Sequence, residues 1–537
     1  MKKIYYEADA RARVLSGAQQ LYDAVKVTFG PKGRNVVIEK SYGAPTITHD
    51  GVTVAEAVDL GATDDNLGEQ IGAKLIKTAA QKLNKVAGDG TTTVTVLTYN
   101  ILSEANKLIA AGMNPMELRK GIERAGAEIV KNIEKSAEKI EGDDKKVAEV
   151  ATISAGDEEI GKLIAEVISK IGKDGVDTVE AGQGLEMEKE NVEGFSYDKG
   201  YSSPFFVTDV NHQEATFDKP LILVTDKKIS AASDILPLLE KCAAAGKKDL
   251  VIIAEEVEGE ALSLLVLNKL KGVFNSLVLK APSFGDRRKE IMEDIAILTD
   301  ATVVSEDKGL KLEEVGLEVL GSAGKVIASK DETTIIKGSG DAKAVKSRIE
   351  LINSQSALAT SDYERGEYDK RAAALSGRVA VIKVGGASET EIDEKKFRVD
   401  DAVAATKAAL AEGIVAGGGV TLVNLADSLK GDTPGESIVK NALKAPFRHI
   451  TANAGLNSEA LLAEVEKAKP GYGINVMAPE KGLVDLKKSG VIDPAKVTKE
   501  AVKNAISIAA TTITMGALIV DVPEKEAPAT PDMGGMY

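Results

Sequence analysis

The sequence predicts a multidomain chain in which an α/β domain is inserted into a mainly helical one. Its 537 residues are enough for three or four domains. Both ends of the chain carry apolar residues at helical spacing, whereas short apolar runs alternate with helical segments between about 194 and 378. Hydrophobic residues make up 43% of the chain and charged residues 28%, an ordinary balance that can bury a large core.

The N-terminal part is predicted to form a helix, a loop, a hairpin and two further helices. Residues 12–29 have helical periodicity, and the GPKG sequence ends that helix because Pro31 and its flanking glycines cannot continue it. Two strands are expected on either side of 42–45. Helical patterns then cover 64–85 and 91–111.

The centre is predicted to contain buried strands separated by amphipathic helices. The expected strands lie in LILVTD (221–226), LVIIAE (250–255), SLVLKAP (276–282) and ATVVS (301–305). Ala-rich helices return after Asp400 and are expected through residue 520. Gly194 and Gly377 are candidate hinges, because glycine tolerates large changes of backbone dihedral angle. The tail, 523–537, is rich in proline and acidic residues and is predicted to be disordered.

Charge and composition exclude several classes of partner. The net charge is −15, with 83 acidic against 68 basic residues, which disfavours nucleic acid and anionic membranes. Cys242 is the single cysteine, so no intrachain disulfide is expected, as in a reducing compartment. The N-terminus lacks the apolar region of a secretory signal, and no membrane-spanning stretch is expected. Three scattered histidines do not predict a His-rich metal site.

The stretch VAGDGTTTVTV (86–96) leaves two interpretations open. Asp89 could cap the following helix, with the threonines in its first turn. Alternatively, the helix start could hold a phosphate through free backbone N–H groups and the positive end of the helix dipole. Asp89 and the threonine hydroxyls would then be suited to Mg²⁺, which prefers oxygen ligands. The chain has no G-x-x-x-x-G-K-[ST] motif, so a P-loop is excluded.

Five other loops flank apolar elements: TFGPKG (28–33), THDGVT (48–53), RVDDA (398–402), VAGGGV (415–420) and GVIDP (490–494). Together with DGTTT, in this order, they resemble the signature stretches of the group I chaperonins, the GroEL type. The resemblance also covers VTFGPKGRNVVIEK, APSFGDRRKEIMEDIAILT and VAVIKVGGASETEIDEKK, and thus essentially the whole chain.

The resemblance implies a GroEL-like division into three domains. A mainly α-helical equatorial ATP domain would comprise 1–136 and 412–522. A small α/β intermediate domain would comprise 137–193 and 379–411. An α/β apical domain, inserted in the middle, would comprise 194–378 and bind clients and the co-chaperonin.

The resemblance also implies an ATP site. Asp89 matches the Mg²⁺ ligand, with K⁺ as an optional second ion, and Asp50 and Asp401 match two catalytic acids near the attacking water. Asp401 is the expected base, although its choice over Asp400 depends on register with the family motif. For Asp493 a turn-forming Asp-Pro is the alternative. The other implied ATP contacts are Thr28, Phe29, Gly30, Pro31, Gly51, Gly90, Thr91, Thr92, Thr93, Ile153, Gly418, Asn475, Val476, Val491 and Asp493.

A protein-binding surface is the second implied site. Residues 264–267 are four consecutive apolar residues that point nearly all round a helix, which fits either a fully buried helix or an exposed apolar patch. The resemblance favours the patch. The positions matching those that bind non-native proteins and a GroES-type co-chaperonin are Tyr201, Phe205, Phe206, Leu236, Leu239, Leu262, Val266 and Leu267.

The implied function is that of an ATP-dependent chaperone, an ATPase often placed in the isomerase class. It would capture non-native proteins and, with ATP and a co-chaperonin, enclose them in a ring cavity to fold. Seven-membered rings, two stacked back to back, and a bacterial cytoplasmic location are expected. On the residues alone, a soluble ATPase or small-molecule kinase and a holdase without an ATP cycle stay open.

The sequence departs from the family pattern at a few positions. Phe29 stands where leucine is common, and Arg378 follows Gly377 where a second glycine is common. Ile474 replaces an aromatic residue near the expected adenine position. The segment 60–66 and the loop before Asp493 are longer than usual, and the tail has only one MGGM.

Overall fold

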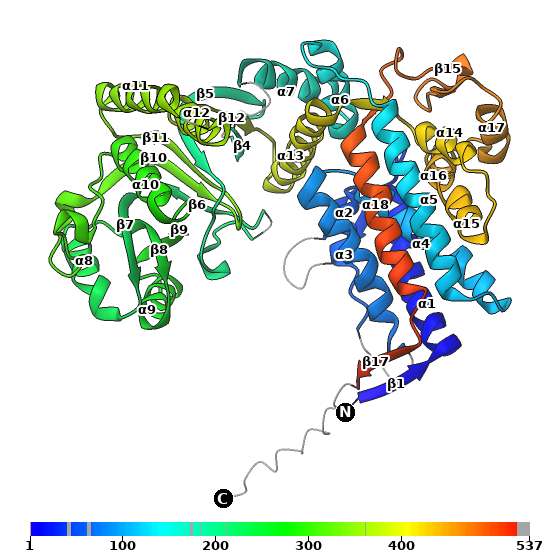
Figure 1. Ribbon diagram of the computed structural model, residues 1–537, viewed down its shortest axis with the longest axis horizontal. Helices are drawn as coiled ribbons and strands as arrows, with labels where there is room; N and C mark the ends of the chain where they lie inside the picture. Colours follow the sequence, from blue (N-terminus) through cyan, green and yellow to red (C-terminus); the bar gives the residue numbers. More distant parts are fainter. Residues whose placement is uncertain are drawn as a thin grey trace, which may run out of the picture. The chain divides into compact units, whose positions relative to one another are not determined.

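The computed structural model describes residues 2–39, 45–61, 66–171, 176–182, 184–210, 212–359 and 361–522. It contains two compact units (Figure 1). The first comprises Met1–Lys173, Gln183–Glu186 and Val384–Tyr537, and the second comprises Asp174–Gly182 and Met187–Lys383. The second unit is thus inserted in sequence between the halves of the first. The three-domain division is finer than these two units and stays a prediction.

The first unit is mainly helical. Its helices are α1 (Glu7–Val25), α2 (Gly51–Ala57), α3 (Glu69–Ala87), α4 (Thr91–Ala110), α5 (Pro115–Ser136), α6 (Asp144–Ala155), α7 (Glu158–Ile171), α13 (Glu389–Glu412), α14 (Val420–Ser428), α15 (Pro434–Ala442), α16 (Ala445–Asn453), α17 (Ser458–Val465) and α18 (Ala495–Thr512), with short 3-10 turns η1 (Lys26–Thr28) and η5 (Pro479–Lys481). The predicted helices at 12–29, 64–85 and 91–111 are confirmed as α1, α3 and α4.

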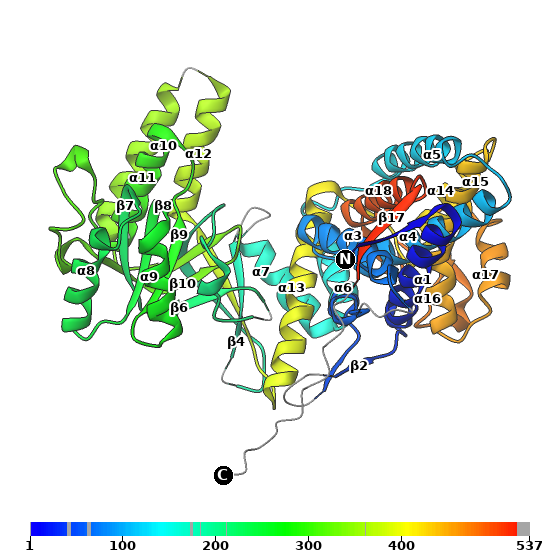
Figure 2. The ribbon, with the colours of Figure 1, turned by 90° about the horizontal axis from the view of Figure 1, so that it is seen from below.

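Helices α4 and α18 form the centre of this unit and run side by side (Figure 1). The Ala-rich pattern explains their close packing, because Ala501, Ala505 and Ala509 are all buried against the apolar face of α4. Gly126 of α5 packs equally closely, since a Cβ there would lie 2.8 Å from Ile506 Cγ1. Figure 2 looks along this bundle, with α16 beside α1 and α4.

Four small antiparallel strand pairs lie in the described part of this unit. They are β1 (Lys2–Tyr6) with β17 (Ala517–Asp521), β2 (Val36–Ile38) with β3 (Thr46–Thr48), β13 (Ile414–Ala416) with β16 (Ile492–Pro494), and β14 (Tyr472–Ile474) with β15 (Leu483–Asp485). The predicted hairpin is β2–β3, and most of its predicted turn lies outside the described residues. The helical prediction was wrong for 517–520, where burial alternates as in a strand.

The second unit has a nine-stranded sheet in the order β4-β12-β5-β11-β10-β7-β8-β9, with β6 paired to β10. The strands are β4 (Val176–Ala181), β5 (Glu188–Tyr197), β6 (Ala215–Asp218), β7 (Leu221–Ile229), β8 (Asp249–Val257), β9 (Asn275–Lys280), β10 (Gly321–Ala328), β11 (Thr333–Gly338) and β12 (Arg378–Val384). The helices are α8 (Ala232–Ala244), α9 (Gly259–Leu270), α10 (Gly285–Thr299), α11 (Ala342–Leu358) and α12 (Asp362–Ser376), and the 3-10 turns are η2 (Pro204–Phe206), η3 (Glu306–Lys308) and η4 (Leu317–Val319).

Three of the four predicted central strands are confirmed as β7, β8 and β9, which are parallel and joined through α8 and α9. The fourth, ATVVS, is wrong as a regular strand. Only Val304 bridges the sheet, opposite Thr225. The neighbouring N–H groups of Ala301 and Thr302 donate instead to Ala296 and Val319, so the backbone donors do not form one ladder.

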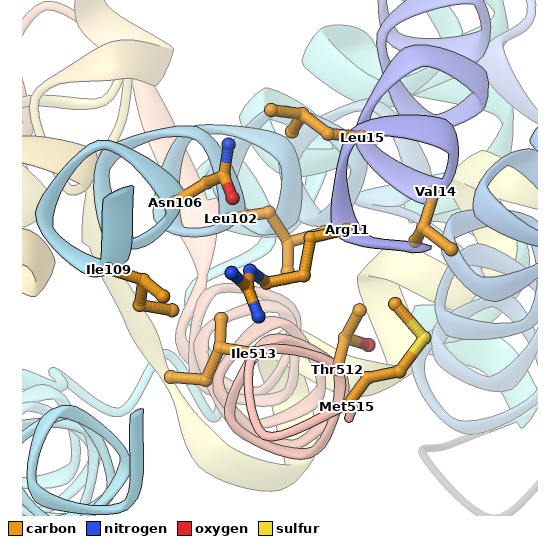
Figure 3. Close-up of a pocket in the computed structure, with 9 residues that line it drawn as sticks. All are labelled: Arg11, Val14, Leu15, Leu102, Asn106, Ile109, Thr512, Ile513 and Met515. Carbon is orange, nitrogen blue, oxygen red and sulfur yellow. The ribbon is translucent and has the colours of Figure 1, made fainter. Parts of the chain in front are cut away.

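A small pocket of about 20 Å³ lies where α1, α4 and α18 meet (Figure 3). The guanidinium of Arg11 extends between Ile109 and Ile513, and its buried Nε has no hydrogen-bond partner among the residues that the structure describes. None of the residues predicted for the ATP site lines this pocket. In the described part of the chain, no helix is long and apolar enough to cross a membrane.

Candidate functional site

The first turn of α4 is shaped by two glycines in the left-handed conformation. Gly88 has φ 69° and Gly90, the N-cap of α4, has φ 88°. A Cβ on Gly88 would lie 2.0 Å from Ala404 Cβ, and one on Gly90 would lie 2.6 Å from Val497 Cγ1. These positions therefore accept only glycine, and they bring α13 and α18 against the start of α4.

Asp89 lies between these glycines and does not cap α4, because no side chain caps this helix. Its carboxylate accepts the N–H of Gly90 and the hydroxyl of Ser154, the latter at 3.2 Å. Burial raises the pKa of Asp89, and the charge of Asp50 adds to this. The helix-cap interpretation is thus wrong for Asp89.

Asp50 stands at the N-terminus of α2. Its carboxylate accepts the N–H groups of Val52 and Thr53, at 3.1 and 2.8 Å, as an N-cap does. The next residue, Gly51, touches the first turn of α4, since a Cβ there would lie 2.2 Å from Thr92 Oγ1. The starts of α2 and α4 therefore face each other, with the hydroxyls of Thr91 and Thr92 directed at Gly51.

Asp401 reaches this site from α13. The pKa of Asp401 is raised well above its usual range, first by burial and then by Asp50, Asp89 and Asp400. Arg398, one turn earlier, donates to the carbonyl of Ala155 at 2.6 Å and so ties α13 to the end of α6 that carries Ser154. Three carboxyl groups from distant parts of the sequence thus lie close enough to oppose one another's ionisation.

Asp493 is the fourth carboxyl, and it interacts with Asp89. It lies in β16, paired with Val415 of β13, so it is a strand residue and the turn interpretation is wrong. A Cβ on Gly417 would lie 2.9 Å from its Oδ1, which places the AGGG loop against this carboxyl. Burial and then Asp89 raise the pKa of Asp493 to about 7. Gly418 has φ +63°.

The residues predicted to contact the base lie beside an apolar cluster. Ile474 and Val476 are buried with Val420 and Phe447, and Val491 packs against the same cluster. Asn475 accepts the N–H of Met477 at 3.0 Å. The surroundings of Ile474 and Val476 are therefore apolar, and contact with a base stays a prediction.

The loop 28–33 begins at η1, which contacts α4 and α16. Thr28 is buried and donates its hydroxyl to the carbonyl of Val25 at 2.8 Å. Gly30 has φ +81°, and the N–H of Gly33 donates back to the carbonyl of Gly30, so the loop closes into a turn around Pro31. Phe29 is partly buried.

Burial and repulsion between carboxyls dominate the electrostatics of this site. Two effects raise the pKa of Asp89, Asp401 and Asp493. The first is burial, and the second is the negative charge of neighbouring carboxyls. Among the described residues, no group of three or more Asp, Glu, His or Cys side chains could hold a metal alone. Carboxylate and threonine oxygens do suit Mg²⁺ if phosphate oxygens complete its coordination.

Sequence reasoning missed two polar contacts at this site. Ser154 follows the predicted Ile153 and bonds to Asp89, whereas the Ile153 side chain is 42% exposed. Asn453 of α16 donates to two carbonyls of the loop at 26–29. Neither residue stands in a motif with known spacing, so only its place in the fold reveals it.

The predicted protein-binding residues lie in the second unit and differ in exposure. Phe205 is 63% exposed, Leu267 53% and Leu236 41%, while Leu262 and Val266 are partly buried. Tyr201, Phe206 and Leu239 lie in the core, where they can support the surface but not contact a partner in this conformation. Leu270 and Val273, which sequence reasoning missed, extend the exposed apolar surface.

Helix α9 settles the choice between a fully buried helix and a half-exposed one. Ala261 and Leu265 form its buried side, and Leu267 points outward, so the fully buried interpretation is wrong. The two candidate hinges are neighbours in space, because the N–H of Gly194 faces the carbonyl of Gly377 at 3.4 Å. Both lie inside the second unit, and their role as hinges stays a prediction.

A model of the TCP-1/cpn60 chaperonin family matches residues 21–523. The match covers every loop of the carboxyl site and the exposed apolar surface. Members of this family assist protein folding, act on client proteins as ring oligomers and are in general ATPases. With nearly its whole length matched, this chain belongs to the TCP-1/cpn60 chaperonin family.

Proposed function

We propose that the protein is a group I chaperonin, an ATP-driven folding machine of the GroEL type. The observation that carries this proposal is the group of carboxyls at the start of α4, formed by Asp50, Asp89, Asp401 and Asp493. They come from four separate elements and oppose one another's ionisation. An arrangement that costs stability in the empty protein is typical of a site that binds a ligand together with a metal cation.

ATP would bind with its phosphates between the starts of α2 and α4. Backbone N–H groups and the hydroxyls of Thr91, Thr92 and Thr93 would contact phosphate oxygens, in place of a P-loop lysine. Asp89 would hold Mg²⁺, which neutralises developing charge on the phosphates. K⁺ would serve as an optional second ion. Asp493 and Gly418 would receive the ribose, and Asn475 and Val476 would face the base.

Asp401 would act as the general base for the attacking water. Its carboxyl has no hydrogen-bond partner among the described residues, whereas Asp50 is committed to two N–H groups of α2. A raised pKa suits a group that must accept a proton during the reaction. Asp50 would then orient the water, and Asp401 would take its proton.

Client proteins would bind the exposed apolar surface of α8 and α9. ATP can release them only if it binds more tightly to a conformation in which this surface is withdrawn. A GroES-type co-chaperonin would compete for the same apolar residues and close the cavity of a seven-membered ring, two of which stack back to back. ATP hydrolysis would return the ring to the state that binds clients. The protein would work in a bacterial cytoplasm.

The test is capture and release. A denatured client is diluted into the purified protein, Mg-ATP is added with and without a co-chaperonin, and both aggregation and client activity are followed. Suppressed aggregation with ATP-dependent recovery is the expected result. Suppression without ATP-dependent recovery would indicate a holdase, and ATP turnover without suppression would indicate a metabolic ATPase or kinase.

A further inference from the structure

Helix α16 is bonded to the loop that would bind phosphate. The side-chain amide of Asn453 donates to the carbonyls of Lys26 and Phe29, at 3.0 and 2.9 Å. Lys26 is the first residue of η1, and Phe29 follows its last residue, directly before Gly30 and Pro31. One NH₂ group that joins two carbonyls three residues apart holds the loop in a single shape.

A second contact comes from the same face of α16. Ile450 lies three residues before Asn453, which places the two side chains on one side of the helix. A Cβ on Gly30 would lie 3.1 Å from Ile450 Cγ2, so the loop packs directly on this side chain. The left-handed glycine and the helix therefore fit each other without a gap.

Helix α16 is itself anchored to the elements on either side of the loop. His449 Nε2 and the hydroxyl of Tyr22, on α1, share a hydrogen bond of 2.6 Å. Tyr22 stacks on Tyr99 of α4, with ring centroids 4.1 Å apart. Phe29 packs against the same small cluster. The anchor therefore lies beneath the loop and does not depend on the loop's own backbone.

The N-terminal end of α16 touches the other half of the site. A Cβ on Gly419 would lie 2.7 Å from the backbone nitrogen of Phe447, so the AGGG loop packs against the first turn of α16. Phe447 also belongs to the apolar cluster with Ile474 and Val476. One short helix thus contacts both the phosphate side and the nucleoside side.

We propose that Asn453 is a positioning residue that holds the loop 28–31 at a set distance from the AGGG loop, and so selects ligands that carry phosphates. This inference rests on the proposed nucleotide site. Because Asn453 acts on the phosphate side, its loss weakens the binding of ATP and ADP but not the binding of adenosine. The acids on α2 and α13 are untouched, so the catalytic rate constant changes little.

Three variants test this. Asn453→Ala removes both donors, and Asn453→Ser retains one. Asn457→Ala is the matched control, because Asn457 caps α17 nearby by accepting the N–H of Ala460 at 3.2 Å and does not touch the loop. Affinities for ATP, ADP and adenosine are measured by competition against a fluorescent ATP analogue, together with kcat, KM and thermal stability.

For Asn453→Ala, the dissociation constants of ATP and ADP are expected to rise about tenfold, the size of one to two lost hydrogen bonds. Adenosine affinity and kcat should stay within about twofold, and Asn453→Ser should show an intermediate rise of about threefold. Asn457→Ala should lower thermal stability and leave all three affinities unchanged.

An unchanged ratio of ATP to adenosine affinity in Asn453→Ala overturns the proposal, whether both affinities hold or both fall. If Asn453→Ala does not fold, the ratio in Asn453→Ser decides in the same way. Failure of the proposed function is a different result, because the wild-type protein itself would then not bind ATP. An Asn453→Ala protein with lower stability and wild-type affinities would give Asn453 a purely structural role.

Discussion

At the scale of single residues, the site is built from carboxyls that destabilise one another. Asp89 raises the pKa of both Asp401 and Asp493, and Asp50 raises that of Asp89 and Asp401. Removing one of them should therefore relieve repulsion in the nucleotide-free protein while it harms function. This opposition of stability and activity distinguishes a ligand site from a structural acid cluster.

Asp401→Ala should bind ATP and hydrolyse it slowly. Loss of a general base costs about 10²- to 10⁴-fold in rate, whereas the contacts to phosphate and base are retained. Single-turnover hydrolysis and nucleotide affinity are measured on the same preparation. Asp400→Ala is the neighbouring control, and near-normal turnover in Asp401→Ala, or an equal loss in both variants, would remove Asp401 from its role as the base.

Asp493→Asn should stabilise the nucleotide-free protein at high pH. The pKa of Asp493 is raised from 3.8 to about 7, so its favourable contribution to folding is present below pH 3.8 and lost as the pH rises to about 7. At pH 8 the free energy of unfolding of the variant should exceed that of the wild type by about 1–3 kcal/mol, a range that is discounted for the partial exposure of Asp493. Thermal midpoints at pH 8 and pH 4.5 are compared. A gain of equal size at both, or the same behaviour in Asp521→Asn, would contradict this origin.

His449→Gln should reduce the loss of stability in mild acid. Burial, Lys26 and Arg448 lower the pKa of His449 from 6.5 to about 4, so its contribution is present above pH 6.5 and lost as the pH falls to about 4. In the wild type, the free energy of unfolding should fall by about 1–2 kcal/mol through this effect in acid, after allowance for solvent screening. Thermal midpoints at pH 7.5 and 5.0 should therefore differ less in the variant than in the wild type, and an unchanged difference would refute this.

At the scale of elements, α9 shows how four consecutive apolar residues are used. Only Leu265 of 264–267 is fully buried, because the sheet takes one side of the helix. Leu267 is left outside, and Leu236 of α8 is exposed in the same way. The proposed binding of client proteins needs an exposed apolar surface of this kind on a folded unit.

Leu267→Glu should weaken client capture by about tenfold or more, since a buried leucine contributes about 1.5–3 kcal/mol. ATPase activity without client should not change, because the carboxyl site lies in the other unit. Light scattering of an aggregating client measures capture. Leu351→Glu on α11, where the leucine is 48% exposed, is the control in the same unit. Equal losses in both variants would point to a general charge effect.

At the scale of the whole molecule, the two units have separate cores. The apolar cluster that contains Ile252 and Leu279 lies wholly in the second unit, and the cluster that contains Leu97 and Ile122 lies wholly in the first. An insertion of this kind leaves each core intact. The small strand pairs of the first unit also expose Tyr6, Val37 and Ile519, which an assembly can cover.

The assembled protein should have a mass near seven or fourteen times the 56.4 kDa of the chain. The reason is that family members act as rings, and exposed apolar strands favour association. Mass photometry at low salt and in 0.5 M salt measures the assembly. A monomer or dimer at micromolar concentration would contradict the proposed ring and leave the metabolic ATPase as the better explanation.

Local pattern predicted much of the fold. The Gly-Pro break after Thr28, the hairpin at 36–48 and the three apolar strands of the second unit follow from rules that act within about ten residues. ATVVS has the composition of a strand, but its backbone N–H groups donate to carbonyls in three different segments. Residues 517–521 form a strand only because β1 lies beside them. Composition cannot decide such cases, since the partner is remote in sequence.

The sequence by itself determined that helical ends enclose an α/β insertion, that DGTTT begins a helix, and, through its motifs, which family the chain resembles. Only the tertiary structure decided that Asp89 does not cap α4, that Asp493 lies in a strand, that α9 is half exposed and that Asn453 donates to two carbonyls of the loop at 26–29. The physical reason is distance along the chain. Periodicity and turn chemistry act locally, whereas burial and charge repulsion depend on groups that folding brings together from hundreds of residues apart.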